Sequence, residues 1–239
     1  MKAVVKVSWH GKVPELKLAT EEGFEHITLS EGRELDLEVV DKRRCTGFHS
    51  KPGNHAPCPE FREIGSGDQC GECRGKDIYT DYRRGNSGKG LDAEYSVYLA
   101  QCGTKVKVGV TKGSRLTTRW REQGANYAAE IFSGLTADEA LAKEKEISSN
   151  GVSERIRKES KTGGSKEKLS KLMEKLEVSG EVQEVSKPLK CSKVVRKGRF
   201  PSPIRNVQGQ IVSNGSICLA LSSGKCVIPA EQKGLDHFN

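Results

Sequence analysis

The chain has 239 residues, a length that suits two small domains or one core with smaller additions. It carries 40 Lys and Arg residues against 32 Asp and Glu residues, and the resulting formal charge of +8 favours polyanionic partners such as nucleic acid. No apolar run reaches the ~18 residues that span a membrane, and the alternating N-terminus does not resemble a signal peptide. We therefore expect a cytoplasmic protein with no membrane segment.

In that compartment thiols stay reduced. The eight cysteines are therefore expected to be metal ligands or small buried side chains instead of a disulfide framework.

The expected fold class is α+β, beginning with a β meander over residues 1–44. Apolar and polar residues alternate in several short runs there, which is the pattern of half-buried strands. The expected strands are 3–9, 15–18, 24–29 and 35–40.

Residues 45–92 lose hydrophobic periodicity and are rich in Gly, Pro, Cys and His, so this segment cannot bury enough apolar surface to fold alone. Cys70 and Cys73 form a CxxC pair on a glycine-containing turn, a spacing that brings two thiolates to one metal ion. We expect a structural Zn²⁺ site here. The expected ligands are Cys45, Cys58, Cys70 and Cys73, with His49 or His55 as a substitute for one of them.

A redox CxxC motif and incidental cysteines are the two alternatives. Structural zinc is favoured because the segment has almost no core, and metal binding can supply on the order of 10 kcal/mol of folding free energy. The remaining cysteines have no partner at ligand spacing and are expected to be small hydrophobic side chains. They are Cys102, Cys191, Cys218 and Cys226.

Residues 93–152 predict a compact domain with the element order β-β-α-β-α. A hairpin is followed by a helix that ends at Gly124, then by a strand and a second helix that begins with the capping box Thr136–Glu139. The expected strands are 95–100, 105–111 and 127–132, and the expected helices run from about 115 to 123 and from about 136 to 149.

Glu144 projects from the apolar stripe of the second helix, close to Leu141 and Ile147. Burying an unpaired carboxylate costs several kcal/mol, so Glu144 is expected to contact a metal ion or an arginine. Arg115 and Arg119, four positions apart on the preceding helix, are the candidate arginines.

Four successive motifs in this segment resemble those of the GIY-YIG nuclease superfamily, in the branch whose second motif reads KIG. They are SVYLA (96–100), KVGVT (107–111), RW (119–120) and ALAKE (140–144). The whole chain, with its cysteine cluster ahead of these motifs, also resembles a prokaryotic domain-of-unknown-function family. The superfamily resemblance implies a three-stranded core and hydrolysis of phosphodiester bonds with Mg²⁺ or Mn²⁺.

In GIY-YIG enzymes a tyrosine of the first motif helps to activate water, an arginine steadies the scissile phosphate and a glutamate holds the divalent metal. The resemblance places these roles on Tyr98, Arg119 and Glu144, with Arg115 as the second-choice arginine. Lys107 stands where most relatives have a second tyrosine. In the alternative interpretation, Tyr98 is a half-buried strand tyrosine and Glu144 forms a structural ion pair with Arg119.

Basic residues on the same hairpin and helix predict a groove that binds the backbone of DNA or RNA. Tyrosines among them, such as Tyr95 and Tyr127, offer stacking surfaces, whereas Trp120 is expected in the core. The basic residues are Lys105, Lys107, Lys112, Arg115 and Arg121.

Residues 153–180 predict a charged helical connector with helices at 153–159 and 165–176. Residues 181–239 predict a small β domain with strands at 209–212, 217–221 and 225–228. Pairing between this region and the N-terminal meander would cover two sheets that are otherwise too small.

The leading functional expectation is a metal-dependent, endonuclease-like phosphodiesterase acting on nucleic acid. One alternative is a non-catalytic nucleic-acid-binding protein that keeps the same fold. The second alternative is a protein-interaction module built from the zinc segment and the terminal sheets.

Overall fold

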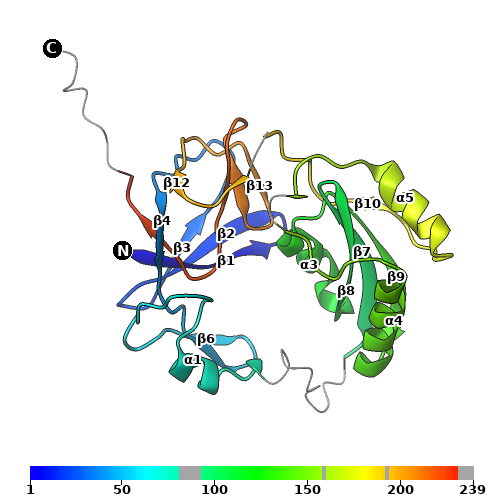
Figure 1. Ribbon diagram of the computed structural model, residues 1–239, viewed down its shortest axis with the longest axis horizontal. Helices are drawn as coiled ribbons and strands as arrows, with labels where there is room; N and C mark the ends of the chain where they lie inside the picture. Colours follow the sequence, from blue (N-terminus) through cyan, green and yellow to red (C-terminus); the bar gives the residue numbers. More distant parts are fainter. Residues whose placement is uncertain (81–92, 158–159, 192–193, 231–239) are drawn as a thin grey trace.

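Strands from both ends of the chain meet in one six-stranded antiparallel sheet, which lies on the left of the computed structural model in Figure 1. The pairing of Ala3 with Cys226 joins the N-terminal meander to the last strand, β16. The sheet order is β12 (Gly198–Arg199), β4 (Glu38–Arg43), β16 (Lys225–Ile228), β1 (Lys2–His10), β2 (Val13–Ala19) and β3 (Phe24–Thr28). The structure describes residues 1–80, 93–157, 160–191 and 194–230.

A smaller four-stranded sheet packs against the six-stranded one. Leucine and valine side chains of both sheets form a shared core that includes Leu16, Leu18, Val212 and Leu219. The order is β11 (Val194–Val195), β15 (Cys218–Ala220), β14 (Ile211–Ser213) and β13 (Asn206–Gln208). The meander and the C-terminal strands thus cover each other's apolar faces.

The cysteine-rich segment is attached to one end of the six-stranded sheet. It contains the hairpin β5 (Phe48–Lys51) and β6 (Asn54–Ala56), followed by the short helix α1 (Gly71–Lys76). Arg43 donates to the carbonyl oxygens of Gly67 at 2.6 Å and Ser223 at 3.0 Å. Phe61 is buried beside Ala3 and Val5 of the sheet.

The central segment forms a second unit, on the right of Figure 1. Its elements follow the order β-β-α-β-α: β7 (Tyr95–Cys102), β8 (Lys105–Lys112), α3 (Leu116–Gln123), β9 (Tyr127–Leu135) and α4 (Ala137–Ser149). A 3-10 turn, η1 (Gly113–Arg115), precedes α3, and the capping box predicted from Thr136 and Glu139 is present. The short strand β10 (Gln183–Glu184) adds a fourth member, so the sheet order is β10-β9-β7-β8.

The two faces of this sheet are covered by different parts of the chain. α4 and α5 (Lys166–Lys175) cover one face, where Leu99, Ile147 and Leu169 pack together. α3 covers the other face, where Tyr98 and Trp120 are buried. Leu141, expected on the buried side of α4, is 38% exposed.

The first expected connector helix is wrong over its described part, residues 153–157; residues 158–159 lie outside the described residues. This stretch runs beside the outer edge of β8, where Ser153 bridges to Lys107 and its carbonyl accepts from the Val108 N–H at 3.1 Å. An open strand edge offers unpaired N–H groups, and bonding to them outweighs a modest helix tendency.

α3 joins the two units. It packs against β1 and β13, and the Gln208 side chain donates to the carbonyl of Gly124, just beyond the end of the helix, at 2.7 Å. Among the described residues, every helix is too short or too polar to cross a membrane.

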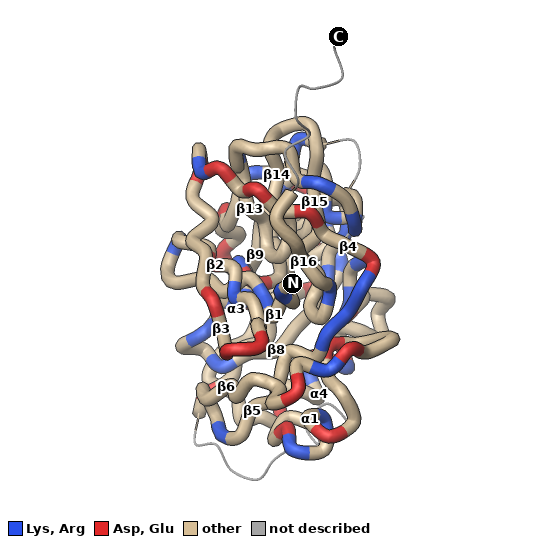
Figure 2. Tube along the Cα trace, turned by 90° about the vertical axis from the view of Figure 1, so that its left-hand side faces the viewer, with Lys and Arg blue, Asp and Glu red and all other residues tan. Residues whose placement is uncertain are grey.

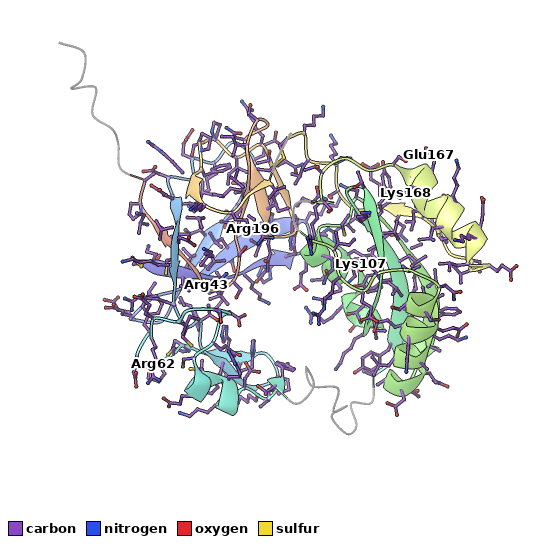
Figure 3. The ribbon with its side chains drawn as sticks, viewed as in Figure 1. Arg43, Arg62, Lys107, Glu167, Lys168 and Arg196 are labelled. Atoms are coloured by element: carbon purple, nitrogen blue, oxygen red, sulfur yellow. A yellow bond between two sulfur atoms is a disulfide. The ribbon has the colours of Figure 1, made fainter. Side chains whose placement is uncertain are left out.

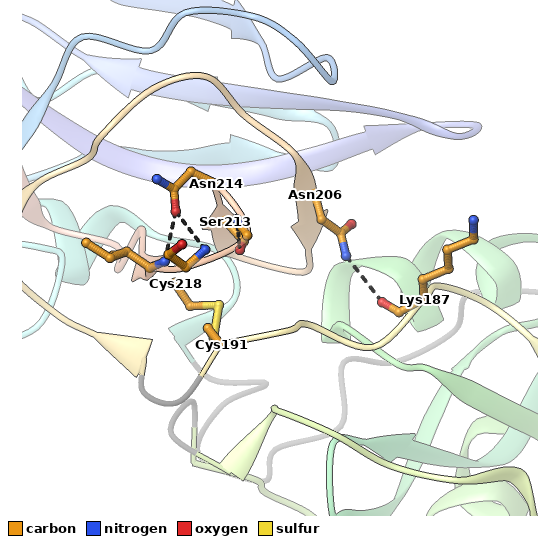
Figure 4. The surroundings of a disulfide bond; sticks show 9 residues. Lys187, Cys191, Asn206, Ser213, Asn214 and Cys218 are labelled. Carbon is orange, nitrogen blue, oxygen red and sulfur yellow. Dashed lines mark hydrogen bonds between the residues drawn. A yellow bond between two sulfur atoms is a disulfide. The ribbon is translucent and has the colours of Figure 1, made fainter.

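Cys191 and Cys218 form a disulfide, which corrects the expectation that both are unpaired small hydrophobic side chains (Figure 4). They are 27 residues apart. Their proximity follows from the parallel pairing of β11 with β15, in which Val194 lies opposite Cys218. Such a contact has no local signal in the sequence.

Candidate functional site

The four predicted zinc ligands lie together in a buried cluster. Cys45 follows β4, Cys58 follows β6, Cys70 is the N-cap of α1, and Cys73 lies in the first turn of that helix. Their sulfur atoms are all within 4.8 Å of one another. In a tetrahedral zinc site the Zn–S distance is about 2.3 Å, which places the sulfurs about 3.8 Å apart. The four thiols are therefore close enough to bind one metal ion.

The surroundings of the cluster favour thiolates once a cation is present. The Cys70 N–H donates to Cys45 Sγ at 3.2 Å, and the Cys73 N–H donates to Cys70 Sγ at 3.5 Å. Burial raises the pKa of Cys45 to about 11, so this thiol ionises near neutral pH only if a positive charge offsets the thiolate.

His49 and His55 lie outside this cluster of four sulfurs in the described part of the chain. Their rings stack on each other at a centroid distance of 4.5 Å. His49 Nδ1 also lies 3.6 Å from a carboxylate oxygen of Asp77. Four cysteine sulfurs complete a tetrahedral coordination shell, so neither histidine is needed as a ligand.

Tyr98 lies fully buried on β7 and is 1% exposed. Its ring lies across Gly109 of β8, where the Cβ of any larger residue would be 2.5 Å from the Tyr98 hydroxyl oxygen. Burial raises the pKa of Tyr98 to about 12, although the charge of Arg119 and a hydrogen bond to Arg119 oppose the shift. The tyrosine therefore stays protonated near neutral pH and supports the arginine.

Glu144 reaches the outer edge of β8 from α4. Its half-buried carboxylate accepts a hydrogen bond from the backbone N–H of Val110. Burial raises the pKa of Glu144, and the nearby charge of Glu154 raises it further, while Lys107 and Arg119 act in the opposite direction. The carboxylate is thus held near two cations in a partly dry environment.

Lys107, on β8 near α3 (Figure 3), has a buried side chain. Its ammonium group donates to the carbonyl of Glu154 at 2.7 Å. Burial lowers the pKa of Lys107, the charge of Arg119 lowers it further, and Glu144 partly offsets both effects.

The charges of these groups act on one another, and the elements that carry them, β7, β8, α3 and α4, pack together. We call this group of residues the β8 cluster. Its members are Tyr98, Lys107, Arg119 and Glu144.

The ion pair expected between Glu144 and an arginine is not formed among the described residues. Arg115 is exposed and lies 3.2 Å from a carboxylate oxygen of Glu122, and Arg119 Nη1 lies 3.4 Å from the same carboxylate group. Of the two arginines, Arg119 is the one whose charge acts on Glu144, and its side chain remains 41% exposed.

The other predicted phosphate-binding residues do not share one groove. Lys105 lines a cavity of about 220 Å³ together with Lys168 and Asn150, at the end of the β7–β8 hairpin. Arg121 lines a much larger cavity beside β1 and β13. Lys112 is half-buried at the end of β8. Lys and Arg residues occur along much of the trace in Figure 2, so their number alone does not identify a binding site.

Lys161 was missed by the sequence analysis, which placed it in a solvated connector. Its ammonium group donates to the carbonyl of Gln123 at the end of α3. Burial lowers the pKa of Lys161, and the charge of Arg119 lowers it further. The only local signal is Gly103, where an added Cβ would lie 2.3 Å from the Ser160 carbonyl oxygen, because the two segments cross closely.

Comparison with known proteins gave one family match. The sequence profile of the family described as "Protein of unknown function (DUF2797)" matches residues 32–213. This range contains the four clustered cysteines and the whole β8 cluster. No curated protein and no solved structure matched the chain.

Proposed function

The chain belongs to the DUF2797 family, as the match over most of its length shows, and we propose that it hydrolyses phosphodiester bonds of nucleic acid at the β8 cluster. One observation carries the proposal. Glu144 is a half-buried carboxylate with no ion pair in the described residues, and its pKa responds to the charge of Arg119, whose side chain is 41% exposed. The resemblance to GIY-YIG nucleases supports the proposal and stays a prediction.

Glu144 would hold a divalent metal ion. Mg²⁺ and Mn²⁺ sites commonly use one or two carboxylates and keep several waters, and a partly buried carboxylate with a raised pKa gains from a nearby cation. When bound, such an ion supplies Lewis-acid activation of the phosphate and of a water molecule. The hydrogen bond from the Val110 N–H to Glu144 fixes the position of the carboxylate.

Arg119 would bind the scissile phosphate and stabilise the charge that develops on its oxygens. Tyr98 is too buried to meet substrate in this conformation, so we assign it to positioning Arg119 through their hydrogen bond. Lys107 adds positive charge behind the site while its ammonium is anchored to the carbonyl of Glu154. Together the two cations favour an anionic ligand.

We also propose that the four clustered cysteines bind one structural Zn²⁺. Four buried sulfur donors within 4.8 Å of one another suit zinc, and four thiolates would fill its coordination sphere and leave no open position for catalysis. The segment around them has few apolar contacts, so the metal would supply much of its folding free energy.

The proposal is tested by incubating the purified protein with Mg²⁺ or Mn²⁺ and labelled single-stranded, duplex and branched DNA and RNA. Cleavage by the wild type is expected, with a loss of at least ~100-fold in Arg119→Ala and in Glu144→Ala. Arg115→Ala, at the N-cap of α3, is the matched control and should keep most activity, because Arg119 and not Arg115 acts on Tyr98, Lys107 and Glu144. No cleavage of any substrate by a folded wild type would count decisively against hydrolysis.

The burial of Tyr98 favours a second candidate, a protein that binds nucleic acid without turnover. Binding of this kind neutralises phosphates and therefore weakens steeply with salt, with a slope of about −0.9 per phosphate on logarithmic axes for duplex DNA. A folded wild type that binds oligonucleotides with such a slope but never cleaves them would establish this alternative.

A further inference from the structure

A groove of about 910 Å³ lies away from the β8 cluster. Its walls come from the β1–β2 turn, α3, residues 184–190 and residues 204–207. This volume is near the upper end of the range for ligand pockets, ~300–1,000 Å³. We call it the α3 groove.

Positive charge dominates the α3 groove. Five cationic side chains line it, against the carboxylates of Glu31 and Glu184. None of the five is ion-paired with a residue that the structure describes, so their charge is available to a ligand. The five are Lys12, Arg121, Lys187, Lys190 and Arg205.

An aromatic ring lies among these cations. Trp9, on β1, is half-buried, packs against the core of the two terminal sheets and lines the groove. Val13, Pro14 and Pro188 add apolar surface beside it. Aromatic rings interleaved with cations are the arrangement by which proteins bind single-stranded nucleic acid, because bases stack on the ring while phosphates contact the cations.

Hydrogen bonds and a disulfide hold the walls of the groove in place. Asn206 donates to the carbonyl of Lys187 at 3.3 Å, and the Cys191–Cys218 disulfide attaches the end of the same segment to β15 (Figure 4). The hydrogen bond from Gln208 to Gly124 holds α3 against β13. The groove is thus formed before any ligand binds, which reduces the entropy lost on binding.

α3 separates this groove from the β8 cluster. Arg121 lines the groove, whereas Arg119, two positions earlier and therefore roughly 200° around the helix, contacts Tyr98. A helix with its side chains is about 10–12 Å across, a distance that a few nucleotides of single strand can span. One strand could therefore contact both sites.

We propose that the α3 groove binds a single-stranded segment of nucleic acid, with a base stacked on Trp9 and phosphates on the surrounding cations. The proposal rests on the proposed function in taking nucleic acid as the substrate, and it adds where the strand is held and that its bases are unpaired. The cations come from several separate elements, so they match a chain of phosphates better than a single phosphate group.

Intrinsic fluorescence tests the stacking, because the chain has only two tryptophans, Trp9 and Trp120. Titrating the full chain with 12-nucleotide oligo-dT or oligo-U, without added divalent ions, should quench the emission in a saturable way. Trp9→Phe should abolish the quenching, since the remaining Trp120 is 2% exposed and cannot meet a base. Equal fractional quenching in Trp9→Phe would overturn stacking on Trp9.

Charge-removing variants test the phosphate contacts. We expect the triple variant Arg121→Gln, Lys187→Gln and Arg205→Gln to weaken oligonucleotide binding at least ~10-fold and to reduce the logarithmic salt slope by about two. The matched control removes three exposed lysines outside the groove, Lys6→Gln, Lys51→Gln and Lys171→Gln, and should change affinity less than about threefold. Equal losses in the two triple variants would contradict a specific groove.

Two further comparisons complete the test. Competition by inorganic phosphate or a mononucleotide at the same concentration as the oligonucleotide would show a small-anion site and overturn the proposal. Groove-dependent binding by a wild type that never cleaves would uphold the groove and refute hydrolysis. Cleavage that the groove variants leave unchanged would refute the groove and leave the proposed function intact.

Discussion

Some charged side chains inside the central unit interact with backbone groups of neighbouring segments. Lys107 and Lys161 are each anchored to a backbone carbonyl, while Glu144 accepts from a backbone N–H. Removing such groups from water shifts each pKa toward the neutral form. Lys107, Lys161 and Glu144 thus all have shifted pKa values within one unit of the protein. Such a concentration is more typical of a ligand site than of a structural core.

The raised pKa of Glu144 predicts a pH-dependent gain in stability for Glu144→Gln. Because the folded-state pKa lies above the ordinary value of 4.5, ionisation of Glu144 destabilises the fold as pH rises through and beyond that value. Without added divalent ions, the variant should therefore have a higher Tm than the wild type near pH 7 and a similar Tm near pH 4, while cleavage is lost.

Glu146→Gln is the matched control, because Glu146 lies on the same helix with an exposed side chain paired to Lys143. It should change Tm little at either pH, since exposed ion pairs contribute about 0–1 kcal/mol. A Tm gain for Glu144→Gln that is equal at both pH values would contradict burial as the cause.

The helices α4 and α1 differ in how strongly their own local sequence specifies them. α4 carries its own start signal, in which Thr136 accepts from the Glu139 N–H while the Glu139 carboxylate accepts from the Thr136 N–H. α1 has only six residues and lies in a segment with little apolar surface. A helix that short does not persist by itself, so its order depends on the cysteines at its start.

The cysteine-rich segment should hold about one zinc equivalent per chain by elemental analysis. Cys73→Ser should lose the metal and make residues 45–80 sensitive to protease, because removing one thiolate opens the closed site. Cys226→Ala, a buried cysteine on β16 outside the cluster, is the control and should keep the metal. A well-folded wild type without metal would refute the zinc assignment.

At the scale of the whole molecule, the two ends of the chain enclose the middle. β16 lies between β1 and β4, so the six-stranded sheet is complete only when the C-terminal strands have arrived. α3 then contacts both β1 and β13, which makes it the structural link between the terminal sheets and the central unit. Strands from the N-terminal region and strands from the C-terminal region therefore belong to one sheet.

The Cys191–Cys218 disulfide joins two residues that are 27 positions apart in the sequence. Chain entropy predicts a contribution of about 3 to 4 kcal/mol for a loop of this length. The double variant Cys191→Ser and Cys218→Ser should therefore unfold at a lower urea concentration than the wild type while retaining its zinc.

Wild-type protein treated with a mild reductant that spares the metal site should match the double variant. If the unfolding midpoints of oxidised wild type and double variant coincide, the disulfide does not stabilise the fold.

Several features followed from local sequence because their causes are local. Alternation marked most of the terminal strands, the Thr136–Glu139 box marked the start of α4, and the spacing of Cys70 and Cys73 marked half of the cysteine cluster. The order β-β-α-β-α also followed, since each of its elements carries its own turn or cap. These signals act within a few residues and need no partner.

Contacts between distant segments were decided by the tertiary structure. The sequence gives no sign that Lys161 meets the end of α3, that Cys191 meets Cys218, or that Arg121 faces away from Arg119 into a different groove. The expected helix at 153–157 failed for the same reason, since the open edge of β8 offers hydrogen bonds that no local pattern reveals. Local propensity is worth a fraction of a kcal/mol per residue, and long-range pairing and burial outweigh it.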